Sequence, residues 1–242
     1  MCVFSYLEVQ DLGRCATVSK QFQNIAYEKS IWKKLPINLY GKQVPNEFIQ
    51  RIFERGTSYL NLHRAEISGG PLNFAKPNSL KYLCLNIHND VMKNILASCT
   101  QLEKLGGLPG LPGGVFYDSN DMTNEMSQCI WQNRESLKCL QMDHPEPQDP
   151  LGMRNARLVD AINECNQLEE LSLFMSPSQQ LLVYNLCKNL PQNLKKLRLN
   201  CIIKLEDFKA LVARCNKLED LSLAIYRIRA VRTPLLNRAS PL

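Results

Sequence analysis

Apolar and polar positions alternate in a six-residue pattern, Leu-x-x-Leu-x-Leu, that recurs along most of the chain. The last three positions of each copy read apolar, polar, apolar, which is the period of a β-strand with one buried face. Two copies are degraded, one beginning with Thr57 and one ending on Gly107. The copies span residues 57–62, 80–85, 102–107, 137–142, 168–173, 194–199 and 218–223, at steps of 22 to 35 residues. The pattern therefore predicts seven short strands at a repeating interval.

Between the copies the apolar period lengthens to that of a helix. Phe48, Ile49, Ile52 and Phe53 form one such stripe, and Gly56 follows it where a helix C-cap belongs. One strand–helix unit cannot bury its own apolar face, so neighbouring units must stack. The arrangement resembles the leucine-rich repeats. That resemblance implies an α/β fold, a horseshoe with a parallel sheet inside and helices outside.

The cysteines follow the same repeat. Cys99, Cys165 and Cys215 each stand three residues before the first position of a copy, which predicts small buried side chains. This resembles the cysteine-containing subclass of leucine-rich repeats and implies a protein of the cytoplasm or nucleus. The ten cysteines include no Cys-x-x-Cys pair, and no spacing of His, Cys, Asp and Glu indicates a metal site. We expect reduced thiols, no cofactor and no bound metal.

Aligning the last three copies places residues of opposite charge on adjacent strands. Parallel strands in register would make them cross-strand neighbours on the exposed inner face of the sheet. The stacked sets are Glu169–Lys195–Glu219, Glu170–Lys196–Asp220 and Ser172–Arg198–Ser222. They form either a charged patch that recognises a ligand or, as the alternation of sign favours, a ladder that neutralises itself. Arg198, between two serines, is the least neutralised of these residues.

Residues 1–36 lack the repeat and predict short helices, with Asp11 capping the second helix and Ile25 and Ala26 beginning the third. The stretch FSYLEVQDLGRCATVSKQF, followed by IAYEKSIWKKL, resembles an F-box, with Phe22 where the family usually has Trp. The matching positions are Phe4–Leu7, Asp11–Leu12, Val18–Lys20, Phe22 and Ser30–Trp32. An F-box followed directly by repeats is similar to the F-box/LRR proteins.

In that family the F-box docks on a Skp-type adaptor, which connects it to a cullin–RING ubiquitin ligase, and the repeats hold a protein substrate. The adaptor-binding residues that the resemblance implies are Phe4, Leu7, Asp11, Leu12, Val18, Phe22 and Trp32. The candidate substrate-binding residues on the concave face are Tyr82, Glu170, Lys196, Arg198 and Asp220. The family's opening Leu-Pro and acidic turn are absent, so we expect an N-terminally truncated F-box.

No catalytic constellation stands out, so the expected role is a non-catalytic receptor subunit. The alternative is a leucine-rich-repeat scaffold that binds protein without a ligase.

Composition and charge add two boundaries. No apolar run approaches the roughly 20 residues of a spanning helix, so we expect no membrane contact. The net charge of +6 first suggests nucleic acid. However, residues 224–242 hold four arginines and no acid, so most of this charge lies in a basic tail. We therefore expect no nucleic-acid partner. Nucleic-acid contact through the basic tail is a third hypothesis for the function. The expected division is a partial F-box at 1–36, repeats at 37–223 and a poorly ordered tail at 224–242.

Overall fold

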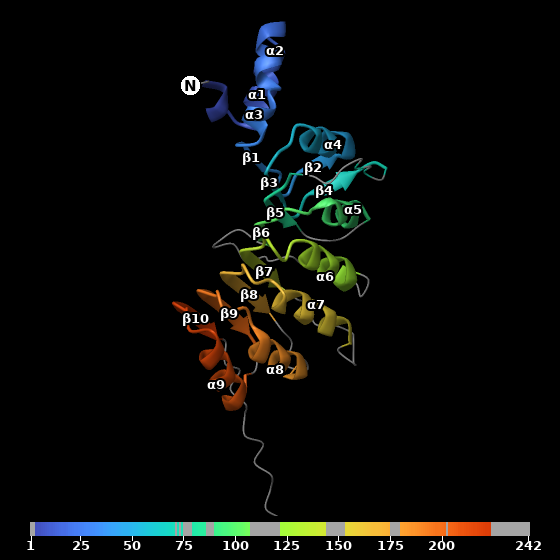
Figure 1. The fold of residues 1–242 in the computed structure, drawn as a ribbon. Helices are drawn as coiled ribbons and strands as arrows, with labels where there is room; N and C mark the ends of the chain where they lie inside the picture. Colours follow the sequence, from blue (N-terminus) through green and yellow to red (C-terminus); the bar gives the residue numbers. More distant parts are fainter. Residues whose placement is uncertain are drawn as a thin grey trace, which may run out of the picture.

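The computed structural model describes residues 3–70, 72, 74, 79–85, 90–106, 122–143, 153–174, 180–201 and 203–223. It begins with a short 3-10 helix and three α-helices: η1 (Val3–Tyr6), α1 (Val9–Ala16), α2 (Lys20–Ala26) and α3 (Lys29–Trp32). Strand–helix units then follow one another in chain order (Figure 1). The predicted basic tail, 224–242, lies outside the described residues.

The strands of the repeat part form one eight-stranded sheet whose spatial order is the order of the chain. Every adjacent pair in it is parallel. Its strands are β1 (Pro36–Asn38), β3 (Tyr59–Leu62), β5 (Tyr82–Leu85), β6 (Lys104–Leu105), β7 (Cys139–Asp143), β8 (Glu170–Phe174), β9 (Lys196–Asn200) and β10 (Asp220–Leu223). A separate parallel pair consists of β2 (Gln43–Pro45) and β4 (Glu66–Ser68).

Six further helices connect these strands: α4 (Asn46–Glu54), α5 (Asp90–Ser98), α6 (Met122–Gln132), α7 (Met153–Asn163), α8 (Gln180–Asn189) and α9 (Leu205–Arg214). They stack on one side of the sheet in chain order (Figure 1). A mostly parallel sheet with helices in this order is compatible with an α/β repeat fold. No helix in the described part of the chain is both long and apolar enough to cross a membrane.

The register of the sheet follows the leucine pattern. The fourth position of every copy pairs with the fourth position of the next, and β1 adds Ile37 to the same row. This row consists of Ile37, Leu60, Leu83, Leu105, Leu140, Leu171, Leu197 and Leu221. Each member except the last is 2% exposed or less. The predicted strands are therefore confirmed, and the row that they share forms a continuous apolar core.

Two local signals explain where helices begin and end. Gly56 has φ +74°, and its N–H donates to the Phe53 carbonyl at 2.9 Å, which closes α4 as its position in the sequence predicts. Ser19 accepts a hydrogen bond from the Phe22 N–H at 3.2 Å and thereby caps α2.

Two predictions about the first helices were wrong. Asp11 lies inside the first turn of α1, whose N-cap is Glu8, and its carboxylate pairs with Arg14 at 3.0 Å. A carboxylate interacts favourably with the helix dipole both at the N-cap and in the first turn. An aspartate in the sequence therefore does not show which of these two positions it occupies. Ile25 and Ala26 end α2 and do not begin α3. The Ala26 carbonyl at that helix end accepts the indole N–H of Trp32 at 2.8 Å.

The third copy of the pattern is degraded because two strands approach closely there. Gly106 has φ +134°, and a Cβ built on it would lie 2.2 Å from the Gln141 carbonyl oxygen. A side chain at this position would clash with the backbone of β7, so glycine is required after the two-residue strand β6. The last position of that copy, Gly107, lies outside the described residues.

Asn133, which is 1% exposed, connects the two repeat units that are farthest apart in the sequence, those whose copies begin at 102 and 137. Its amide oxygen accepts the Leu102 N–H at 2.6 Å, and its amide nitrogen donates to the Cys99 carbonyl at 2.8 Å. The side chain thus satisfies two backbone groups of the preceding unit, which are 31 and 34 residues away in the chain.

Candidate protein-interaction surfaces

The first surface lies on the N-terminal helices, which pack around a small core. Leu12 is fully buried and Trp32 is 2% exposed. Ala16 and Ala26 are buried beside them and allow the short helices to approach each other. The indole hydrogen bond to Ala26 fixes the orientation of Trp32.

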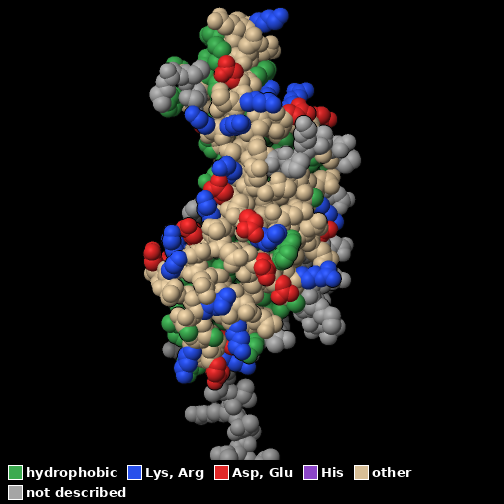
Figure 2. All heavy atoms as spheres, viewed as in Figure 1, with side chains coloured by type: hydrophobic (Ala, Val, Ile, Leu, Met, Phe, Trp, Pro, Cys, Tyr) green, Lys and Arg blue, Asp and Glu red, His purple; other side chains and the backbone are tan. Residues whose placement is uncertain are grey.

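Large apolar side chains remain exposed around this core. Val3, Tyr6 and Val18 are 73%, 71% and 70% exposed, and Phe22 and Tyr27 are exposed by about two fifths. In Figure 2, hydrophobic side chains reach the surface over these helices. Exposed apolar side chains of this size are typical of surfaces that contact another protein.

The structure separates the adaptor-binding residues that the resemblance implies into two groups. Val18 and Phe22 are exposed, Phe4 and Leu7 are partly buried, and Asp11 lies on the surface of α1. Phe4 packs edge-to-face on Phe22, with ring centroids 5.4 Å apart. Leu12 and Trp32 are buried and hold the helices together, so the exposed surface of this set comes from its other members. Contact with an adaptor stays a prediction for these residues.

A clamp of three side chains joins these helices to the repeat part. The Arg55 guanidinium, at the end of α4, lies 4.0 Å from the ring centroid of Tyr27 and 4.4 Å from that of Trp32. Nearby, the Ser58 hydroxyl donates to the Lys33 carbonyl. The sequence pattern did not single out Arg55, because the contact depends on how two non-adjacent segments meet.

The second surface runs across the parallel strands of the sheet, where charges alternate from one strand to the next. Glu103 lies between two lysines, 2.6 Å from Lys81 Nζ and 3.1 Å from Lys138 Nζ. Farther along, Lys195 pairs with Glu169 at 2.8 Å. The hydrogen bonds from the two lysines lower the pKa of Glu103, and its carboxylate raises the pKa of Lys81. These contacts agree with the interpretation that the ladder neutralises itself.

The predicted substrate-binding residues of the last strands lie together. Lys196 pairs with Glu170 at 2.9 Å, and this hydrogen bond lowers the pKa of the Glu170 carboxyl. Arg198 lies 3.9 Å from Asp220 and keeps 65% of its side chain exposed, so it is the least neutralised cation of this group. In Figure 2, acidic and basic side chains alternate along the edge of the molecule where the strands lie. Contact with a substrate stays a prediction for these residues.

Aromatic side chains gather near the first strands of the sheet. Tyr82 lies beside Tyr59 on the next strand, with ring centroids 5.9 Å apart, and Tyr40 stacks on His63 at 5.4 Å. Burial raises the pKa of Tyr59. Of these aromatic residues, only Tyr82 was predicted from the sequence, as a candidate substrate-binding residue. Tyr59 occupies the third position of the weakest copy, so the alignment of repeats could have indicated it.

The cysteines of the repeat are buried, as the pattern predicts. Burial raises the pKa of Cys165 and of Cys187 to about 12, so both remain thiols at neutral pH. Among the residues that the structure describes, no three His, Cys, Asp or Glu side chains are placed to hold a metal ion.

A family model described as F-box-like matches residues 1–37. The match ends within β1, where the sheet begins. A comparison with curated proteins found no match. An F-box-like domain therefore forms the N-terminal part of this chain, on the same residues that carry the resemblance in the sequence. Domains of this class connect a protein to an adaptor.

Proposed function

We propose that this protein is the substrate-recognition subunit of a Skp–cullin–F-box ubiquitin ligase. The F-box-like domain would bind a Skp-type adaptor, and leucine-rich repeats in a horseshoe would hold the target protein on their inner face. The observation that carries the proposal is the F-box-like domain with its exposed apolar side chains, centred on Val18 and Phe22. The protein would act in the cytoplasm or nucleus.

Such a subunit works by positioning and has no chemistry of its own to perform. Holding a target near the transferring enzyme raises the effective concentration of its lysines. The clamp between Arg55 and the rings of Tyr27 and Trp32 supports this role, because it connects the adaptor end to the repeats without a long linker.

The test is binding of the full chain to a purified Skp-type adaptor. We expect wild type to form a complex and Val18→Asp to weaken it at least about tenfold, because a buried interfacial carboxylate would lose its water. Val212→Asp on α9 is the matched control, since that valine is 50% exposed at the far end of the repeats.

A folded wild-type chain that does not bind the adaptor would overturn the ligase role. It would leave the alternative, a repeat scaffold that binds protein without a ligase. Equal binding by Val18→Asp and wild type would instead remove the adaptor surface from this face of the domain.

A further inference from the structure

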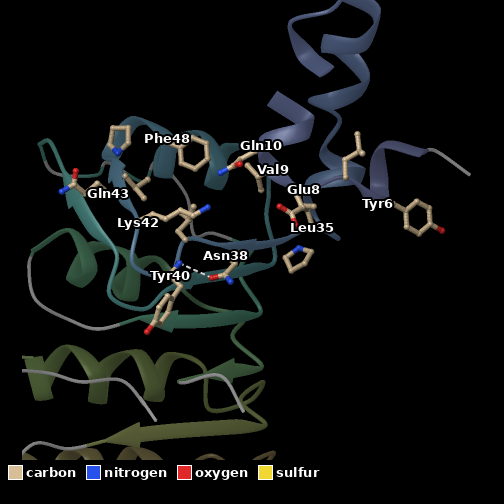
Figure 3. A pocket seen from close by; sticks show the side chains of 15 residues that line it. Tyr6, Glu8, Val9, Gln10, Leu35, Asn38, Tyr40, Lys42, Gln43 and Phe48 are labelled. Carbon is tan, nitrogen blue, oxygen red and sulfur yellow. Dashed lines mark hydrogen bonds between the residues drawn. The ribbon is translucent and has the colours of Figure 1, made fainter. Parts of the chain in front are cut away.

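A groove lies between the F-box-like domain and the first unit of the repeat. Its volume is about 680 Å³, within the range of ligand-binding clefts. The start of α1 forms one wall, and β1, β2 and α4 form the other (Figure 3). The groove borders the two surfaces described above, because Tyr6 and Leu7 of the first and Tyr40 of the second also line it. Val18, Phe22 and the charged pairs of the later strands lie outside it.

Two strands that line this groove, β1 and β2, each have one edge that is not paired with another described strand. β1 begins the sheet, and no other described strand pairs with its outer edge. The Leu39 N–H donates to Asn61 on β3 at 2.8 Å, and peptide groups alternate along a strand, so the N–H and C=O of Asn38 face the outer edge. β2 likewise pairs with β4 alone in the part of the chain that the structure describes. Free strand edges are templates for an added strand.

The lining of the groove combines an apolar floor with one charge on each wall. Val44 and Leu39 are nearly fully buried, and Val9 and Phe48 pack against the core from opposite sides. The two walls carry the charges: Glu8 at the start of α1 and Lys42 before β2 point into the groove from opposite sides (Figure 3). The structure records no ion pair between these two described residues, so each is able to pair with a ligand group.

We propose that this groove binds an extended peptide segment of a partner protein, which adds a strand to the outer edge of β1. Alternate apolar side chains of the segment would lie on the Val9–Phe48 floor. An acidic residue would pair with Lys42, and a basic residue with Glu8. An extended peptide fits better than a small molecule because main-chain donors and acceptors line the site together with side chains. This binding goes beyond the proposed function and does not depend on the adaptor.

The probe is a phage-displayed library of random eight-residue peptides, selected on the purified full chain. We expect enriched peptides that alternate apolar residues and carry one acidic and one basic residue. Their synthetic forms should lose at least about tenfold in affinity when Gln10→Trp fills the groove. Asn185→Trp, on an exposed face of α8, is the matched control and should bind like wild type.

A charge exchange makes the test more specific. Glu8→Lys combined with Lys42→Glu keeps the net charge and should favour peptides with the opposite order of acidic and basic residues. No enriched peptide, or equal binding by wild type and Gln10→Trp, would overturn the proposal. So would loss of adaptor binding in Gln10→Trp, because the groove would then belong to the adaptor interface. Retained adaptor binding with lost peptide binding would support it.

Discussion

The F-box-like domain and the repeat part bury their apolar residues in different ways. Among the described residues 3–27, five large apolar side chains are exposed: Val3, Tyr6, Val18, Phe22 and Tyr27. In the repeat part, the leucine row is almost completely covered from Ile37 to Leu197. Each repeat unit buries the apolar face of its neighbour, whereas helices of four to eight residues have no such neighbour on their outer side. The comparison teaches that stacking completes the core of the repeats, whereas the short helices at the end keep apolar side chains exposed.

The largest expected effect comes from removing the core side chain of each region. Trp32→Ala should destabilise the F-box-like domain by about 3–5 kcal/mol, through lost burial and a cavity. Leu171→Ala, in the central row, should cost about 2–5 kcal/mol. Hydrogen exchange followed by mass spectrometry would locate the loss. We expect faster exchange within residues 3–35 for Trp32→Ala and across β7, β8 and β9 for Leu171→Ala.

Uniform acceleration in both variants would contradict this comparison. It would mean that the F-box-like domain and the repeats unfold as one cooperative unit.

A smaller effect should follow from opening the clamp between the two regions. Arg55→Ala should lower the free energy of unfolding by about 0.5–2 kcal/mol, because it removes the cation–π contacts to Tyr27 and Trp32. A double-mutant cycle with Tyr27→Ala would isolate the contact. Arg51→Ala, exposed on the same helix, is the control. A coupling free energy of zero between positions 55 and 27 would mean that the clamp adds no stability.

The smallest effect concerns the charged ladder of the repeats. The lysines hold the pKa of Glu103 below its ordinary value of 4.5 in the folded state. The contribution of this carboxylate to stability is therefore present above pH 4.5 and is lost as the pH falls through the lower, folded pKa. Glu103→Gln should flatten the acid side of the melting temperature against pH. Glu47→Gln on α4 is the control. Identical pH profiles for wild type and Glu103→Gln would refute the role of the ladder.

Much of the repeat architecture could be predicted, because its signal is local and periodic. The spacing of Leu140, Leu171 and Leu197 predicts both the strands and their register, and the structure pairs them accordingly. The same periodicity places Cys165 in the core. The helix boundaries near Asp11 and Ala26 were less predictable. Acidic and apolar residues occur on either side of such boundaries, and at Ala26 the helix end accepts a tertiary hydrogen bond from Trp32 that the local sequence does not show.

The candidate sites were predicted only in part. The resemblance placed the adaptor contacts on residues 4–32 but did not distinguish buried Leu12 in α1 from exposed Val18 in the turn after it, because both are aliphatic residues at motif positions. Alignment of the repeats predicted that Glu170, Lys196 and Asp220 lie together, and they do. The groove beside β1 was not predicted, since its walls belong to segments that carry no shared pattern.

The sequence by itself determined the strands of the seven copies and which of their residues share a row, because these features depend on a period of two residues that the sequence shows directly. It also placed an F-box-like domain, through the order of motif residues from Phe4 to Trp32. The tertiary structure alone decided the contact of Arg55 with two aromatic rings, the need for glycine at 106 and the groove between the two regions. Each of these depends on the distance and angle at which separate segments meet, and a local pattern of apolar and polar residues contains no record of either.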